Sequence, residues 1–267
     1  MDFSMFFTQL SVGILGLTPV VPWRAVGKGY YLVNLLVALA FLPLAWFFRA
    51  SAVRGFPAFG ADADGATNAL VSAYATAAAL AVLVFWLGPG GAGARLSVAA
   101  TVLGAAAVAA DGVRQASLVP GAGASPAATP LLLSLNYLAG AGVLGSVVGA
   151  MLLGHWYLVV KDLPVAPLKA LTVLFFVFLG ARLALLGAAW AADPAGFARL
   201  ADRATVFLVV RLLFGLGAPL AMSWMIWGTV AVRSTQAATG ILYGVVVFVL
   251  MGEAAARFLL LKTGIPL

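Results

Sequence analysis

The feature that most constrains this chain is a series of apolar runs, each long enough to cross a lipid bilayer as a helix. A transmembrane helix needs about 20 consecutive, predominantly apolar residues. Eight such runs occur, at 2–22, 29–50, 67–88, 95–119, 129–160, 168–192, 204–232 and 235–262. The predicted fold class is therefore an all-α integral membrane protein of about eight transmembrane helices, forming one polytopic membrane domain over residues 1–267.

Composition favours the same class. The 267 residues are 64% hydrophobic and only 9% charged, and their mean hydropathy is +1.12, whereas roughly a quarter of the residues in soluble domains are charged. The lipid bilayer is thus the first expected partner. Helix-breaking segments such as Gly88-Pro89-Gly90 and Asp193-Pro194 separate the runs, as loops between spans should.

Several kinds of chemistry are disfavoured by the residues that are missing. The chain has no cysteine and one histidine, His155, so we expect no metal site and no cofactor held by metal ligands or covalently in this chain. The net charge of +7 comes from basic residues scattered at span ends, which does not favour a nucleic-acid partner. No phosphate-binding loop or hydrolase motif is present, and the loops are short. The chain is therefore expected to be at most a membrane subunit of an oxidoreductase complex and not an autonomous enzyme.

Loop charges suggest an orientation. Six basic residues, including Arg24 and Lys28 of the first loop, lie in the connections that follow odd-numbered spans, and five, including Arg49 and Arg54, lie on the opposite side. Because basic loops tend to stay on the cytoplasmic side, both termini are expected outside. We expect a multi-pass protein of a bacterial-type inner (cytoplasmic) membrane.

Ionisable residues inside the spans give the main functional hypothesis. They are Asp111, Arg114, Arg182, Arg211, Glu253 and Arg257. Alternation of the spans places all six in the same half of the membrane, and Gln9 and Asn136 fall at that level too. Charges at membrane depth are costly unless they are paired or face protein or water, so we expect one polar cluster. Glu253 and Arg257 lie four residues apart and are expected to pair along one helix face.

The cluster as predicted has more arginine than carboxylate. The surplus positive charge calls for an anion, a carbonyl-rich ligand, a lipid headgroup or acidic groups from another subunit. A purely structural network that fixes helix packing is the alternative. An acid followed by arginine ends both the fourth and the eighth span, which raises the hypothesis of a parallel repeat with halves 1–119 and 129–267.

Other segments have plainer interpretations. His155, Trp156 and Tyr157 are expected to form an interfacial anchor at the opposite membrane face, although His155 could also donate a proton. Gly13 and the 145–149 segment are expected where helices approach closely. Pro219 is expected to kink the seventh span near Gly215.

Four features of the chain occur together: eight spans, no cofactor ligands, polar residues at one level of the membrane, and the sequence Gln9-Leu10-Ser11-Val12-Gly13 in the first span. In these features the chain resembles the NrfD-like family, the membrane-anchor subunits of polysulfide and dimethyl sulfoxide reductases. The resemblance implies a haem-free helical bundle that binds a quinol near the face where an iron–sulfur partner docks. It assigns no individual residue of this chain.

Three hypotheses follow. The first is a non-haem membrane subunit of a respiratory or electron-transfer complex that contacts a quinone or docks other subunits. In this hypothesis Asp111 or Glu253 would accept a proton. The ligand would be bound by Arg114, Arg182, Arg211, Arg257, Gln9 and Asn136. The second is a secondary transporter or channel for an anionic substrate. The third is a structural or assembly scaffold, whose charges hold the helices together or bind a lipid.

Overall fold

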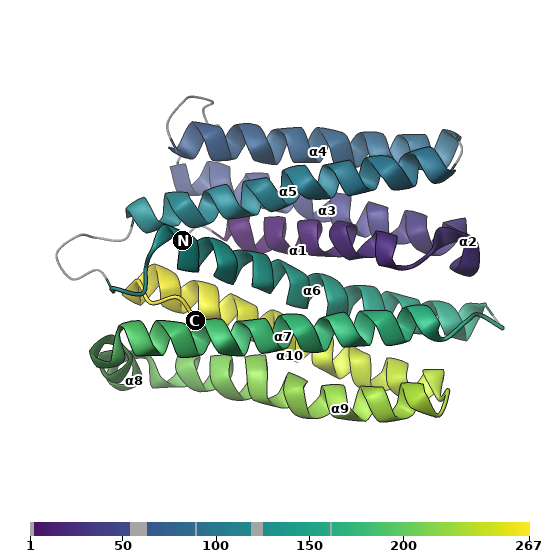
Figure 1. The fold of residues 1–267 in the computed structure, drawn as a ribbon. Coiled ribbons are helices and arrows are strands. Elements are labelled where there is room, and N and C mark those ends of the chain that lie inside the picture. The colour runs from purple at the N-terminus through teal and green to yellow at the C-terminus, as the bar shows by residue number, and fades with distance from the viewer. Residues whose placement is uncertain (1–2, 54–62, 89, 119–124, 161) are drawn as a thin grey trace.

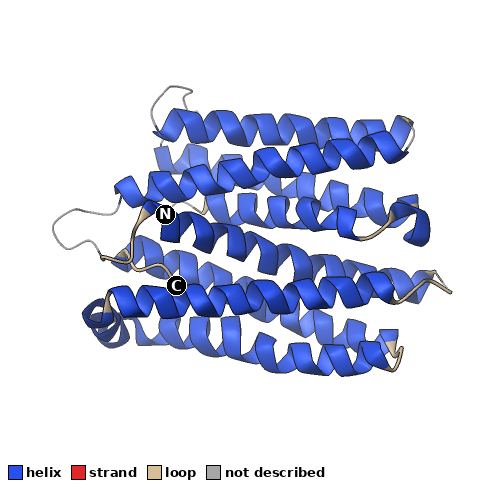
Figure 2. Cartoon of the chain, in the orientation of Figure 1, coloured by secondary structure: helices blue, strands red, loops and turns tan. Residues whose placement is uncertain are grey.

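The fold is helical throughout the part that is described. The computed structural model describes residues 3–53, 63–88, 90–118, 125–160 and 162–267, and within these ranges every regular element is a helix (Figure 2). Positions used in the sequence-based expectations that lie outside the described residues are Asp2, Arg54, Pro89, Val119 and Lys161.

The elements follow one another with short connections. In chain order they are α1 (Ser4–Leu17), the 3₁₀ turn η1 (Thr18–Val20), α2 (Trp23–Val26), α3 (Lys28–Val53), α4 (Ala63–Leu87), α5 (Gly90–Leu118), α6 (Pro130–Val159), α7 (Ala166–Ala192), α8 (Pro194–Val209), the π-helix η2 (Val210–Gly217), α9 (Ala218–Ala231) and α10 (Thr235–Thr263).

The described residues contain seven helical stretches long and apolar enough to cross a membrane, and the chain is a multi-pass membrane protein. An eighth stretch, Ser4–Val20, is apolar but shorter. The expected continuous first span over 2–22 is therefore wrong in detail: the α-helix ends at Leu17. Pro19, which lacks a backbone N–H, lies in the 3₁₀ turn that follows.

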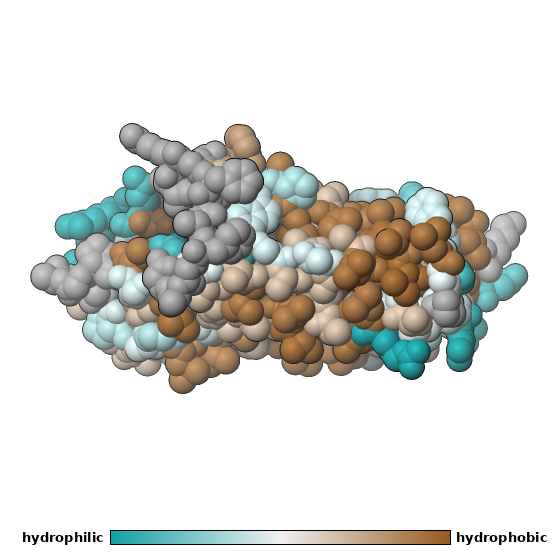
Figure 3. All heavy atoms as spheres, turned by 90° about the horizontal axis from the view of Figure 1, so that it is seen from above, coloured by the Kyte–Doolittle hydropathy of each residue, from teal (hydrophilic) through white to brown (hydrophobic). Residues whose placement is uncertain are grey.

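The long helices lie side by side along one direction (Figure 1). α4 and α5 form one flank, α7 and α9 the other, and α6 lies between them with α1 and α10. The start of α1 and the end of α10 lie at the same end of the bundle (Figure 1). The surface over the middle of the bundle is largely hydrophobic, and hydrophilic residues gather towards its two ends (Figure 3), which is the pattern of a bundle that spans a bilayer.

The contact between α1 and α6 is made by glycines, as the small-residue spacing predicted. A Cβ added to Gly13 would lie 2.0 Å from the carbonyl oxygen of Ala141, and one added to Gly145 would lie 2.1 Å from the backbone of Gly13. The two backbones therefore touch, and neither position has room for a methyl group. A comparable contact joins Gly215 of η2 to Gly252 of α10.

The seventh span differs from its predicted form. Its backbone leaves helical geometry at Ala204 (φ −140°, ψ 34°), where the expected span began, so the kink lies inside α8 and residues 194–203 form a separate helical part before it. α8 lies across the end of the bundle, where Figure 1 shows it end-on. The predicted distortion before Pro219 takes the form of the π-helix η2, whose wider turn ends just before that proline.

Candidate functional site

Buried charges form a layer across the end of the bundle that holds both termini. All eight polar residues predicted to share one level are buried, and six of them fall into two groups of contacts. We call them the Glu253 group (Arg182, Arg211, Glu253 and Asn136) and the Asp111 group (Arg49, Asp64, Asn68, Asp111 and Arg114), and together with Arg257, Tyr137 and Gln9 they form the charged layer.

Glu253 is the centre of its group. Arg182 of α7 donates to both of its oxygens, from Nε to Oε1 (3.1 Å) and from Nη2 to Oε2 (2.7 Å), which is the bidentate geometry of strong arginine–carboxylate pairs. Arg211 of η2 donates from Nη1 to Oε1 (2.8 Å). One carboxylate of α10 thus joins two other segments, and it is paired with two guanidinium groups.

Further acceptors complete the coordination of Arg182. Its Nη1 donates to the side-chain oxygen of Asn136 and, at 3.3 Å, to that residue's carbonyl oxygen. Its Nη2 donates to the carbonyl oxygen of Leu267 at 3.0 Å. Segment 264–267, which leaves α10 at Gly264 in the left-handed conformation (φ 74°), therefore folds back over the Glu253 group.

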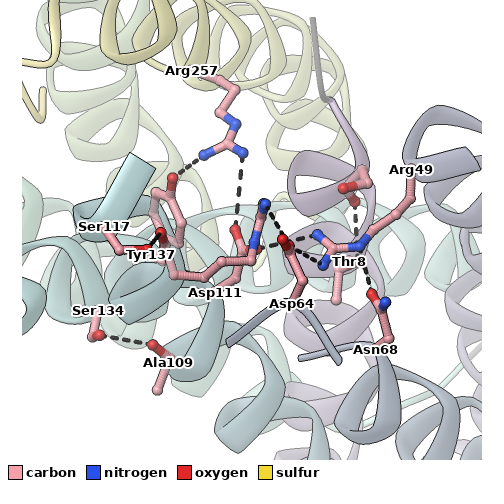
Figure 4. Close-up of polar contacts among 12 residues, drawn as sticks. Thr8, Arg49, Asp64, Asn68, Ala109, Asp111, Ser117, Ser134, Tyr137 and Arg257 are labelled. Carbon is pink, nitrogen blue, oxygen red and sulfur yellow. Dashed lines mark hydrogen bonds and ion pairs between the residues drawn. The ribbon is translucent and has the colours of Figure 1, made fainter. Parts of the chain in front are cut away.

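Asp111 is the centre of the second group (Figure 4). Nε of Arg114 lies 2.5 Å and Nη1 of Arg49 lies 3.5 Å from Asp111 Oδ1. Both arginines also contact Asp64 Oδ1, at 3.2 Å and 3.3 Å respectively. Nε of Arg49 donates to Asn68 Oδ1 at 2.7 Å. The ends of α3 and α5 and the start of α4 are held together by these contacts.

Arg257 contacts the Asp111 group, which corrects the predicted pair with Glu253, and it lines the same small cavity as Glu253 and Arg182. Its Nη2 lies 3.9 Å from Asp111 Oδ2, and its Nη1 donates to the hydroxyl of Tyr137. Glu253 and Arg257 lie four residues apart and so on one face of α10, but they contact different helices. Glu253 pairs with Arg182 and Arg211, and Arg257 pairs with Asp111. Gln9 donates to the carbonyl oxygen of Tyr137 at 3.0 Å, so α1 is also tied to this junction.

Sequence reasoning missed four members of the layer: Arg49, Asp64, Asn68 and Tyr137. Arg49 was assigned to the loop charges that orient the chain, yet it is buried and faces Asp111. The alternation of the spans places Arg49 on the same side of the membrane as the predicted cluster, and this could have identified it as a member. Asp64 lies in the first turn of α4, before the start of the expected span 67–88, and 51% of its side chain is exposed. It was therefore not counted among the charges inside the spans.

Hydrogen-bond donors exceed acceptors in the layer. Within the described part, Nε and Nη2 of Arg211 and Nδ2 of Asn136 are buried without a protein acceptor, and five arginines face three carboxylates. Unpaired buried donors carry a desolvation cost of about 1–3 kcal/mol each. Arg211 is fully buried, so a hydrogen-bond acceptor placed beside its two unpaired nitrogens would remove the largest desolvation cost in the layer.

The space beside Asn136 and Glu253 is small, and Arg211 does not line it. A cavity of about 20 Å³ is lined by Gln9, Asn136, Tyr137, Arg182, Glu253, Ala256, Arg257, Leu260 and Leu267. About 10–15 Å³ of such volume accommodates one water molecule. In this conformation the layer has room for a water but not for an aromatic ring, and Leu267 forms part of the wall.

The predicted interfacial anchor lies at the other end of the bundle. Trp156 donates from Nε1 to the carbonyl oxygen of Val26 (2.9 Å), and Tyr157 donates to the carbonyl oxygen of Pro164 (2.8 Å). Nδ1 of His155 lies 3.0 Å from the hydroxyl of Tyr243. These contacts tie the end of α6 to α2, to the α6–α7 connection and to α10.

The residues that the structure describes contain no group of three or more histidine, aspartate or glutamate side chains placed to hold a metal ion. Comparisons of the chain with protein-family models, with curated proteins and with solved structures found no match.

Proposed function

We propose that this chain is a non-haem membrane subunit of a respiratory or electron-transfer complex, and that its charged layer binds a quinone. The observation that carries the proposal is Asn136: it lines the small cavity beside Glu253, and its Nδ2 is buried with no acceptor within the described residues. Arg211, which bonds to Glu253 from outside that lining, adds two more buried nitrogens without an acceptor. A quinone brings carbonyl oxygens and no hydrogen-bond donor, which matches a layer rich in donors.

The side chains have distinct roles in this proposal. Glu253 would accept a proton from the quinol, because its carboxylate lines the small cavity that the ring would enter. Asn136, which lines the cavity, would donate to a ring oxygen through Nδ2, and Arg211 would hold the carboxylate of Glu253 in place. The electrons would pass to a redox partner subunit.

Access requires a local rearrangement. Since the cavity holds about 20 Å³, a ring can enter only if segment 264–267 moves and the bond from Arg182 to the carbonyl of Leu267 is released. That segment is not part of a helix, so its displacement leaves the helical hydrogen bonds intact.

The first test is what the chain retains when it is purified in mild detergent. Extraction of the bound lipids should yield a quinone in near-stoichiometric amount from the wild type and less from Asn136→Leu, which loses the spare amide. Ser146→Ala is the matched control, because Ser146 is buried on the same helix and bonds only within it. Absence of any quinone, together with anion uptake by proteoliposomes of the chain alone, would instead support the transporter.

The second test addresses the proton. Quinol-dependent turnover of the purified complex should be lost in the triple variant Glu253→Leu/Arg182→Met/Arg211→Met, which removes the carboxylate without leaving a buried arginine unpaired, with the partner subunits still bound. Normal turnover in that variant would exclude Glu253 as the proton acceptor.

A scaffold is the second candidate, and the extent of pairing in the layer favours it. Glu253 and Asp111 each contact at least two arginines from different helices, which suffices to fix helix positions without a ligand. In that case, replacing the Glu253 group by apolar residues should leave the activity of the assembled complex unchanged.

A further inference from the structure

A second cavity lies apart from the charged layer's small cavity, between α8 and the end of α10. Its volume is about 460 Å³, which is within the range of small-molecule sites. Its lining combines three cations, Arg199, Arg203 and Lys262, with apolar side chains that include Leu200, Phe207, Phe258 and Ile265.

The position of α8 explains why cations and apolar groups meet here. The kink at Ala204 turns the first part of α8, residues 194–203, across the end of the bundle. Leu200 is buried against Ile265 and the end of α10, whereas Arg199 and Arg203 are exposed. A helix with one buried apolar face and one charged face, placed at the end of a transmembrane bundle, lies at the level of the lipid headgroups.

The cations converge from two elements. Arg199 and Arg203 are four residues apart and so share a face of α8, and Lys262 is in the last turn of α10. In the part of the chain that is described, none of the three forms an ion pair with a carboxylate. The cavity therefore has positive charge that the protein does not neutralise.

One carboxylate, Asp193, also lines the cavity, but it has other partners. Its Oδ1 accepts from the backbone N–H of Gly196 at 2.8 Å and caps the start of α8. The Ser125 hydroxyl, the Gly196 amide and the charge of Arg199 hold the pKa of this carboxyl below its usual range. Asp193 is ionised at neutral pH, and the three cations still outnumber it.

The apolar side of the cavity is aromatic. The rings of Phe207 and Phe258 stack with centroids 4.1 Å apart and an interplanar angle of 22°. Phe207 is 41% exposed, so the stack forms a wall that is open to the surroundings of the bundle. A soluble anion gains nothing from such a wall, whereas an acyl chain can lie against it.

From this geometry we infer that the cavity between α8 and α10 binds an anionic phospholipid. Arg199, Arg203 and Lys262 contact the phosphate headgroup, and the acyl chains lie along Phe207 and Phe258. Basic pockets at membrane interfaces provide the charge and the hydrogen bonds that such headgroups need.

The test uses the full chain in detergent and measures its thermal unfolding during titration with defined probes. Phosphatidylglycerol should raise the unfolding temperature, while phosphatidylcholine with the same acyl chains and inorganic phosphate should raise it much less. In Arg199→Gln/Arg203→Gln the apparent affinity for phosphatidylglycerol should fall by roughly fivefold for each lost arginine, or about 25-fold for the pair.

Arg24→Gln/Arg95→Gln is the matched control, because it removes two exposed cations at the other end of the bundle. It should respond to phosphatidylglycerol like the wild type. Four results would overturn the inference. An equal response to phosphatidylcholine would indicate a general lipid effect, and an equal response to inorganic phosphate would indicate a free-anion site. The other two are an unchanged affinity for phosphatidylglycerol in the Arg199/Arg203 variant and an equal loss of that affinity in the Arg24/Arg95 control. Gel filtration of each variant checks that it is folded, and both substitution sites of the test variant are exposed.

Discussion

Oε1 of Glu253 accepts hydrogen bonds from both Arg182 (Nε, 3.1 Å) and Arg211 (Nη1, 2.8 Å). The two arginines come from α7 and η2, so a single carboxylate oxygen joins three segments that are distant in sequence. Like charges so close together repel, and the carboxylate is what makes their joint burial tolerable. The stability of this end of the bundle therefore depends on Glu253 more than on either arginine.

Loss of the Glu253 charge should be strongly destabilising. Glu253→Gln leaves two buried arginines without their carboxylate, and removal of one partner from a buried ion network costs about 3–5 kcal/mol. The triple variant Glu253→Leu/Arg182→Met/Arg211→Met should unfold at a temperature close to that of the wild type. Thermal unfolding in detergent compares the two, and an equally unstable triple variant would contradict this account of the group.

The two aspartates of the Asp111 group should differ. Asp111 is fully buried, whereas 51% of the Asp64 side chain is exposed. Asp111→Asn should cost about 3–5 kcal/mol, because it leaves buried arginines uncompensated. Asp64→Asn should cost about 1 kcal/mol or less, as solvent screens its charge. Equal losses measured by denaturant unfolding would show that burial does not set the contribution of these pairs.

The α1–α6 contact should not tolerate a methyl group. Gly13→Ala and Gly145→Ala each place a Cβ about 2 Å from backbone atoms, so we expect a loss of about 1–3 kcal/mol or more from forced separation of the helices. Gly240→Ala is the control, because a Cβ there meets nothing within 4 Å. It should be neutral or stabilising by up to about 1 kcal/mol, since alanine favours helix. Unfolding temperatures of the three variants provide the comparison.

The cap of α8 should depend on pH. Asp193→Ala removes the bond to Gly196 and should cost about 1 kcal/mol, while Asp193→Asn, which can still cap, should cost less. Because the folded-state pKa of Asp193 is depressed, the charge-dependent part of its contribution is present above the unfolded pKa of about 3.9 and is lost as pH falls through the folded value. The difference between wild type and Asp193→Asn in unfolding temperature should shrink on acidification, and a difference that grows would contradict this sign.

The small-residue pattern predicted one of the two glycine contacts between helices. Gly13 and Gly145 were expected at a helix contact because only small residues let helix backbones touch in a membrane, and the structure confirms that they do. The contact between Gly215 and Gly252 carried no comparable signal, because it forms where the π-helix η2 meets α10.

The sequence by itself determined the membrane class, the order of the spans and the depth shared by the buried charges. These follow from hydropathy, from helical rise and from the alternation of direction between successive spans, all of which are local or additive along the chain. The tertiary structure alone decided the partners. Depth is set by position along a helix, but a partner is set by the rotation of that helix about its axis and by its neighbours. For this reason Glu253 pairs with Arg182 and Arg211, and Arg257 turns to Asp111 and Tyr137, although the two residues lie one helical turn apart.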